Sequence, residues 1–372
     1  MAPWRRVTGV VGLAAGAVAA GAGVIVAAER IAVGRARVLR SSAAPAALGQ
    51  LRGTPLTVLT EDRVSLHVEI DEPTTDAHSG SGGQPPPVTI IFCHGYTLNQ
   101  DCWHFQREGL RPHHRMVFWD QRDHGRSGRS AAGAASVGRL GADLDLVIKA
   151  VAPGDMPVVL VGHSMGGMTI MALAEQHPEL FGTKVVGAVL VSTAARGLDA
   201  GSPWMPAPFR PVLRRAVPGV LRGASKGVRA GIVERGRQVS ADLAFLGTRY
   251  IGFGDSGTDP AVIEFLEQMI RATPIEVIAA FAQALYKCDM RGSLEVLGKV
   301  PVVVVTGEKD RLIAPTLGLE LAAQIPGADL VWVPGAGHAV ILERPDIVNQ
   351  AIDRLVSRAT AGGGVAGWAD AG

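Results

Sequence analysis

The chain of 372 residues has only three cysteines, Cys93, Cys102 and Cys288. This odd number, with no pair at metal-ligand spacing, excludes a disulfide framework and gives no argument for a metal site. Aromatic residues make up 5% of the chain, and the formal net charge is only +2. Neither an internal repeat nor an aromatic-rich basic stripe is present, so a nucleic-acid partner is not expected. What remains is a chain long enough to bury a sizeable core.

The amino-terminal residues 1–40 differ in composition from the rest. Residues 7–28 carry no charge, with arginines on both sides, and 22 residues are enough to span a bilayer core. Eight of them are alanine and five are glycine, which contribute little transfer free energy. We expect a single N-terminal membrane anchor, with a cleaved secretory signal or a buried helix as alternatives. The expected localisation is therefore membrane-anchored, or secreted if a signal is cleaved.

Residues 41–54 have the composition of a tether, and the first part of a folded core is expected over residues 55–193. Two alternating runs, Pro55–Thr60 and Val64–Ile70, flank a tight acidic turn and predict a β-hairpin. A Gly/Ser/Pro loop follows at 74–87.

Beyond this loop, short and continuous apolar runs alternate with helical patterns. The runs are 88–92, 115–119, 157–161, 185–191, 301–306 and 329–333, and the helical patterns are 101–109, 136–151, 166–176, 316–325 and 345–358. Continuous apolar strands separated by helices are typical of a parallel sheet that is covered on both faces. The sequence therefore predicts an α/β fold with a mostly parallel, doubly wound sheet.

One long segment interrupts this alternation. Residues 194–297 contain no comparable strand and are expected to form a helical cap inserted between two strands, before the core resumes at 298–358. Between Arg196 and Arg237, nine basic residues stand against two acidic ones, with apolar residues interleaved. This segment is either a solvated basic surface or a face that lies on an anionic bilayer. A flexible tail is expected at 359–372.

A serine between glycines stands at the junction of a strand and a helix. Gly162-His163-Ser164-Met165-Gly166 follows an apolar run directly and precedes a run of helix-forming residues. A sharp turn of this kind lifts one side chain out of the sheet, and small neighbours are required because the serine backbone is strained. We predict that Ser164 is a nucleophile.

A serine hydroxyl needs a base, and the base needs a carboxylate to fix its tautomer. Asp310 and His338 each follow a predicted strand by a short loop, and open α/β sheets place their sites at the carboxyl ends of the strands. The order Ser164, Asp310, His338 is also the order that this type of sheet uses. Glu308 and Asp199 are rival candidates for the acid.

The reaction also needs donors for an oxyanion. Met165 N–H opens the helix after Ser164, and Tyr96 N–H follows Gly95 in the loop after the strand 88–92. These two amides are the predicted oxyanion hole. His94 and His163 are expected to support their turns by hydrogen bonding.

With these pieces in place, the chain resembles the α/β-hydrolase family over about residues 55–358. The matching motifs are His94-Gly95-Tyr96, Asp120-Gln121-Arg122-Asp123-His124-Gly125, the glycine-flanked Ser164 turn, Gly307-Glu308-Lys309-Asp310 and Gly337-His338. The resemblance implies a serine esterase or lipase with a catalytic triad and no cofactor or metal. Ser164, where other branches carry aspartate, is unlike the epoxide hydrolases and dehalogenases, and Asp123 departs from the glycine that many relatives carry.

The expected reaction is hydrolysis of small-molecule carboxylic esters, including lipid-like ones, through an acyl-enzyme. An aminopeptidase, with Glu264, Glu267 or Glu276 holding the substrate amine, and a cofactor-free perhydrolase would use the same three residues. A non-catalytic membrane scaffold that retains the fold is the alternative from a different class.

Overall fold

A computed structural model describes residues 48–73, 88–197 and 241–361 of the chain. Within these residues, eight strands form one sheet in the order β1-β2-β4-β3-β5-β6-β7-β8. The strands are β1 (Thr54–Leu59), β2 (Ser65–Asp71), β3 (Thr89–Cys93), β4 (Arg115–Trp119), β5 (Val158–His163), β6 (Val185–Val191), β7 (Val302–Gly307) and β8 (Asp329–Val333). The β1–β2 hairpin is antiparallel and joins β4 in antiparallel register, whereas β3 to β8 pair in parallel. The prediction of a mostly parallel, doubly wound α/β sheet is confirmed.

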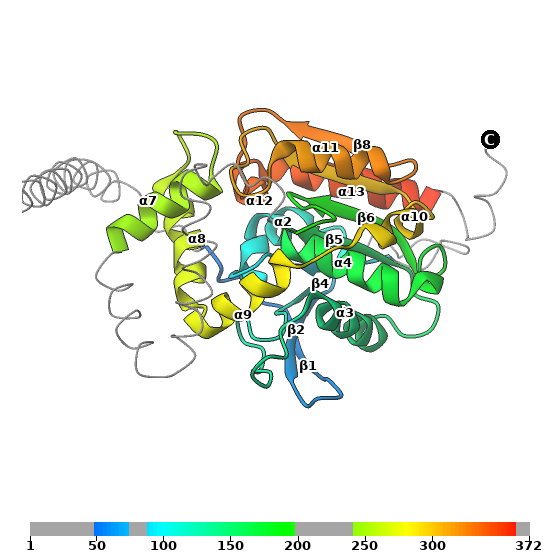
Figure 1. The fold of residues 1–372 in the computed structure, drawn as a ribbon. Helices are drawn as coiled ribbons and strands as arrows, with labels where there is room; N and C mark the ends of the chain where they lie inside the picture. Colours follow the sequence, from blue (N-terminus) through cyan, green and yellow to red (C-terminus); the bar gives the residue numbers. More distant parts are fainter. Residues whose placement is uncertain (1–47, 74–87, 198–240, 362–372) are drawn as a thin grey trace, which may run out of the picture.

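Helices cover the two faces of the sheet (Figure 1). Their bounds are α2 (His104–Leu110), α3 (Val137–Val151), α4 (Met165–Gln176), α11 (Pro315–Gln324), α12 (Val340–Glu343) and α13 (Pro345–Ala361). Short 3₁₀ turns occur at Gln100–Trp103, Pro178–Leu180 and Arg291–Ser293. The predicted helix at 101–109 is thus divided into a 3₁₀ turn and α2, and α13 continues three residues beyond the predicted end at 358.

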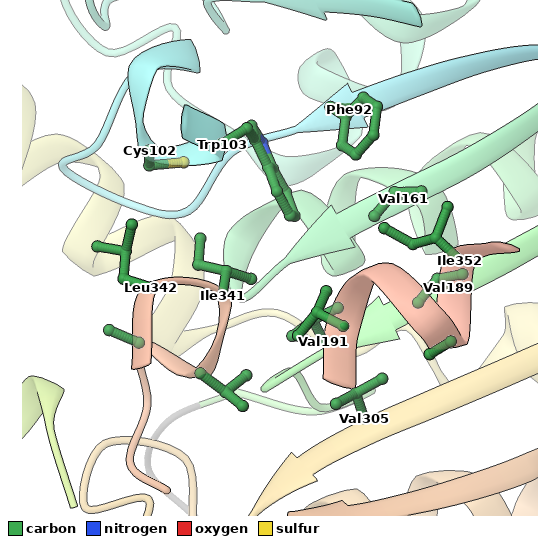
Figure 2. Close-up of a cluster of buried hydrophobic side chains, with 14 of the residues drawn as sticks. Phe92, Cys102, Trp103, Val161, Val189, Val191, Val305, Ile341, Leu342 and Ile352 are labelled. Atoms are coloured by element: carbon green, nitrogen blue, oxygen red, sulfur yellow. The ribbon is translucent and has the colours of Figure 1, made fainter. Parts of the chain in front are cut away.

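Alternate residues of the central strands enter two separate apolar layers. Phe92 of β3 packs in the layer with α2, α12 and α13, whereas Cys93 packs in the layer with α3, α4 and α11. Figure 2 shows the first layer, where Trp103 lies against Phe92 and the strand valines face the last helices. Every residue of β3 is buried between the two layers, which is why this strand is a continuous apolar run in the sequence.

The described part of the insertion between β6 and β7 is helical. It consists of α7 (Ala241–Gly252), α8 (Pro260–Ala272), α9 (Ile275–Tyr286) and α10 (Leu294–Leu297). Figure 1 places α7, α8 and α9 together at one end of the molecule, beyond the sheet. We use "the insertion" below for residues 241–297.

The predicted membrane-anchored localisation has to be corrected. Within the three described ranges, no helix is long and apolar enough to cross a membrane. Residues 7–28 and the basic segment from 198 to 237, on which the prediction rested, lie outside those ranges. Alanine and glycine dominate residues 7–28, and such a run has the length of a span with little of its transfer free energy. The described residues thus support neither the predicted membrane anchor nor membrane association.

Candidate active site

Ser164 occupies a strained turn between β5 and α4. Its backbone has φ 52° and ψ −115°, a conformation that residues with a side chain rarely adopt. A Cβ at Gly166 would lie 2.0 Å from the carbonyl oxygen of Cys93, and a Cβ at Gly162 would lie 2.5 Å from the carbonyl oxygen of Gly166. Both glycines are therefore required for the turn to pack against β3. The turn is also held by the Thr193 hydroxyl, which donates to the Ser164 carbonyl at 2.7 Å.

Asp310 and His338 meet at the carboxyl ends of β7 and β8. The His338 Nδ1 lies 2.8 Å from Asp310 Oδ2. The other carboxylate oxygen, Oδ1, accepts the backbone N–H groups of Leu312 and Ile313, both at 2.8 Å. These two bonds fix the carboxylate plane, so Oδ2 is directed at the imidazole. With Nδ1–H donated to Asp310, the free nitrogen Nε2 is left as a proton acceptor.

His163 connects the serine turn to the loop that carries His338. Its Nε2 lies 3.0 Å from the His338 carbonyl oxygen, to which it donates, and the two ring centroids are 4.9 Å apart. Burial lowers the pKa of His163 to about 3, so the ring is neutral at ordinary pH. The opposite nitrogen, Nδ1, faces the loop after β3, where a Cβ at Gly95 would lie only 2.7 Å away. One buried imidazole thus contacts the three segments that a serine hydrolase must bring together.

A second buried network fixes the start of the loop after β3. The Gln121 backbone N–H donates to His94 Nε2 at 2.9 Å, so His94 Nδ1 carries the proton and donates to the Gly95 carbonyl at 2.8 Å. The Gln121 side chain donates to the His94 carbonyl at 2.6 Å and accepts the Thr169 hydroxyl of α4. Burial lowers the pKa of His94 to about 4, which keeps it neutral. The expected supporting role of His94 and His163 agrees with these contacts.

The two predicted oxyanion donors come from elements that pack together. Met165 is the first residue of α4, and the first N–H groups of a helix have no acceptor within the helix. The Tyr96 side chain packs on the apolar cluster that contains Met165 and Phe281 of α9. The loop that carries the Tyr96 N–H therefore lies beside the N-terminus of α4.

Of the two rival acids, only Glu308 can be compared with Asp310. Glu308 is exposed and its carboxylate accepts the Gly335 N–H at 2.8 Å, while Asp199 lies outside the described residues. Within the part of the chain that the structure describes, no group of three or more His, Cys, Asp or Glu side chains could hold a metal ion.

Glu343 is a site-related residue that sequence reasoning missed. Its buried carboxylate accepts the N–H of Gly337, directly before His338, at 2.7 Å, and the N–H of Asp255 in the insertion at 2.6 Å. It thereby fastens the His338 loop to the insertion. The signal in the sequence is faint, because a glutamate after Ile341-Leu342 has no motif around it.

Comparison with known proteins identifies the family of the chain. A model of the alpha/beta hydrolase family matches residues 90–351. Among curated proteins, the pimeloyl-[acyl-carrier protein] methyl ester esterase of Xanthomonas oryzae pv. oryzae is 25% identical over 274 residues, which cover 72% of this chain and 94% of that protein. The esterase of the same name from Stenotrophomonas maltophilia is 27% identical over 219 residues, or 58% of this chain and 74% of that one.

Among solved structures, the thermophilic esterase of Thermogutta terrifontis has a TM-score of 0.61 at 24% identity and covers 82% of this chain and 99% of its own. The enol-lactonase of Burkholderia xenovorans LB400 has a TM-score of 0.58 at 24% identity, over 79% of this chain and 97% of that one. These structural likenesses show the fold. Because the family model spans more than half of the sequence, the chain belongs to the alpha/beta hydrolase family.

Proposed function

We propose that this protein is a serine hydrolase that cleaves small-molecule carboxylic esters through an acyl-enzyme. The observation that carries the proposal is the 2.8 Å contact between His338 Nδ1 and Asp310 Oδ2. The loop that carries His338 is also hydrogen-bonded to His163, the residue directly before Ser164 in the strained turn. The named relatives are esterases, which supports ester hydrolysis as the reaction.

The proposed reaction gives each of these groups a defined role. Ser164 Oγ attacks the ester carbonyl carbon while His338 Nε2 takes its proton, and Asp310 stabilises the imidazolium. The carbonyl oxygen becomes an oxyanion that accepts hydrogen bonds from the N–H groups of Met165 and Tyr96. When the C–O bond to the alcohol breaks, His338 returns the proton to the leaving oxygen. Water then repeats the sequence on the acyl-enzyme and releases the acid.

The insertion is proposed to act as a cap that bounds the substrate site. Its helix α9 supplies Phe281 to the cluster beside Met165, and its residues Gly254 and Asp255 bind the Glu343 carboxylate next to the His338 loop. An ester panel graded by acyl length tests whether this boundary selects short, carboxylesterase-type substrates or long, lipase-type ones.

No observation favours the other activities that share these residues. For an aminopeptidase, an acid in the insertion would have to hold the substrate amine. Glu267 is buried and already paired with Arg271 one turn later, and Glu276 is exposed. Perhydrolase activity is tested by adding peroxide and a carboxylate to the same assay.

The proposal is tested by replacing the nucleophile. Ser164→Ala is expected to abolish turnover of p-nitrophenyl esters and to leave the circular dichroism spectrum and the melting temperature near those of the wild type. Ser192→Ala is a matched control, because Ser192 also follows a strand and has a positive φ of 47°. Full esterase activity in Ser164→Ala would contradict the proposal.

A further inference from the structure

Two hydroxyl groups join the loop after β3 to the insertion. The Tyr96 phenol donates to the backbone carbonyl of Ile278 in α9. The Thr273 hydroxyl, between α8 and α9, donates to the backbone carbonyl of Thr97 at 2.9 Å. The loop after β3 is therefore the donor in one bond and the acceptor in the other. The two bonds involve its adjacent residues Tyr96 and Thr97.

The loop needs an external support at this point. Thr97 has φ 64°, and the left-handed region is unfavourable for a β-branched residue, so the conformation persists only where surrounding contacts hold it. The start of the loop has its own support in the core, where the His94 and Gln121 contacts hold Gly95. The far side, at Tyr96 and Thr97, is bound to the insertion.

Burial makes both bonds strong constraints. Thr273 is 4% exposed, and Thr97 is 9% exposed. Burial also raises the pKa of Tyr96, so its phenol stays protonated and remains a donor at neutral pH. Losing the Thr273 hydroxyl leaves the buried Thr97 carbonyl without that donor, and losing the Tyr96 phenol removes the donor to the partly buried Ile278 carbonyl.

We propose that the hydroxyls of Tyr96 and Thr273 are positioning groups for the oxyanion hole, so that the insertion must be docked for the Tyr96 N–H to point at the reacting oxygen. This inference rests on the proposed function and adds a role for the insertion in the chemical step. Substrate is held mainly by other contacts, whereas the oxyanion exists only in the transition state and the intermediates. Removing either hydroxyl therefore lowers kcat more than it raises KM.

The experiment compares Tyr96→Phe and Thr273→Val with two matched variants. Thr273→Ser keeps the hydroxyl, and Tyr286→Phe removes a phenol from the exposed end of the same helix α9. We expect kcat to fall about 10- to 100-fold in Tyr96→Phe and Thr273→Val, the size of effect that small misplacements of catalytic groups produce, with KM within about threefold of the wild type. Thr273→Ser and Tyr286→Phe are expected to retain wild-type kcat.

A second measurement separates positioning from loss of fold. A trifluoromethyl ketone forms a tetrahedral oxyanion on the serine, so its inhibition constant is expected to rise by the same factor as kcat/KM falls. If Thr273→Val unfolds, the comparison is made on Tyr96→Phe alone, which removes a single oxygen. Wild-type kcat and unchanged ketone inhibition in Tyr96→Phe would overturn the inference. Equal losses in Thr273→Ser and Thr273→Val would do so too. Because the proposed function fails only if Ser164→Ala stays active, the two failures are distinguishable.

Discussion

Replacing Asp310 by asparagine exchanges one carboxylate oxygen of the candidate site for an amide NH₂ group. The structure determines which of the two oxygens is exchanged. Asp310 Oδ1 accepts two backbone N–H bonds at 2.8 Å, from Leu312 and Ile313, and an amide nitrogen cannot accept them. The amide oxygen of Asp310→Asn therefore stays at that position. Its NH₂ group takes the place of Oδ2 and faces His338 Nδ1.

The consequence is a change of tautomer. Two donors cannot face each other at 2.8 Å, so His338 Nδ1 gives up its proton and accepts from the new amide, while the proton moves to Nε2. Nε2, the nitrogen proposed to take the Ser164 proton, then carries a proton itself and has no lone pair to accept another. We expect kcat to fall about 10⁴-fold, the loss seen when the same carboxylate is neutralised in serine proteases, and this equals about 5.5 kcal/mol of transition-state stabilisation.

The assay is steady-state hydrolysis of p-nitrophenyl butyrate, with melting temperature as the check on fold. Glu308→Gln is the matched control. This acid lies in the same loop as Asp310, is exposed to solvent, and accepts a hydrogen bond from the Gly335 backbone N–H. We expect it to retain kcat within about threefold. A kcat for Asp310→Asn within tenfold of the wild type would refute the reasoning, as would an equal loss in Glu308→Gln.

Three further predictions concern stability. Gly166→Ala places a Cβ against the Cys93 carbonyl, and we expect it to lower the free energy of unfolding in urea by roughly 3 kcal/mol or to prevent folding; wild-type stability would contradict the close packing. Glu343→Gln turns an NH₂ group toward one of the amides it binds, such as that of Gly337, and should cost about 1–3 kcal/mol in the same assay, whereas no loss would show that these bonds are not held. Because the pKa of His163 is about 3 in the fold and near 6.5 when unfolded, stability should fall as pH drops below about 6.5, by up to about 1.4 kcal/mol per pH unit for this group; an unchanged pH slope in His163→Asn would count against it.

The sequence was sufficient for the sheet, and the three candidate residues remain a prediction from it. Buried parallel strands are continuous apolar runs, so β4 and β6 have the bounds that the sequence predicts. The largely exposed edge strand β8 has its predicted bounds as well. The order of strands in a doubly wound sheet then brings the residues after β5, β7 and β8 to one edge. Local pattern and a general rule of topology together are the basis for predicting that Ser164 and the two residues after the last strands share that edge.

The sequence was not sufficient for the contacts that support the site. Tyr96 and Ile278 are 182 positions apart, and the bond between them uses a backbone carbonyl that any residue would offer. The Glu343 carboxylate likewise binds backbone N–H groups, which leave no trace in residue type. The membrane prediction rested on the length and absence of charge of residues 7–28, which lie outside the described ranges.

The account depends on Ser164 being the group that becomes acylated. The most direct test is mass spectrometry of the intact protein and of its peptides after reaction with a fluorophosphonate. We predict one adduct per chain, on the peptide containing Ser164, absent in Ser164→Ala and formed far more slowly in His338→Ala. An adduct on another residue of the active wild-type protein, or no adduct while ester hydrolysis continues, would contradict the account.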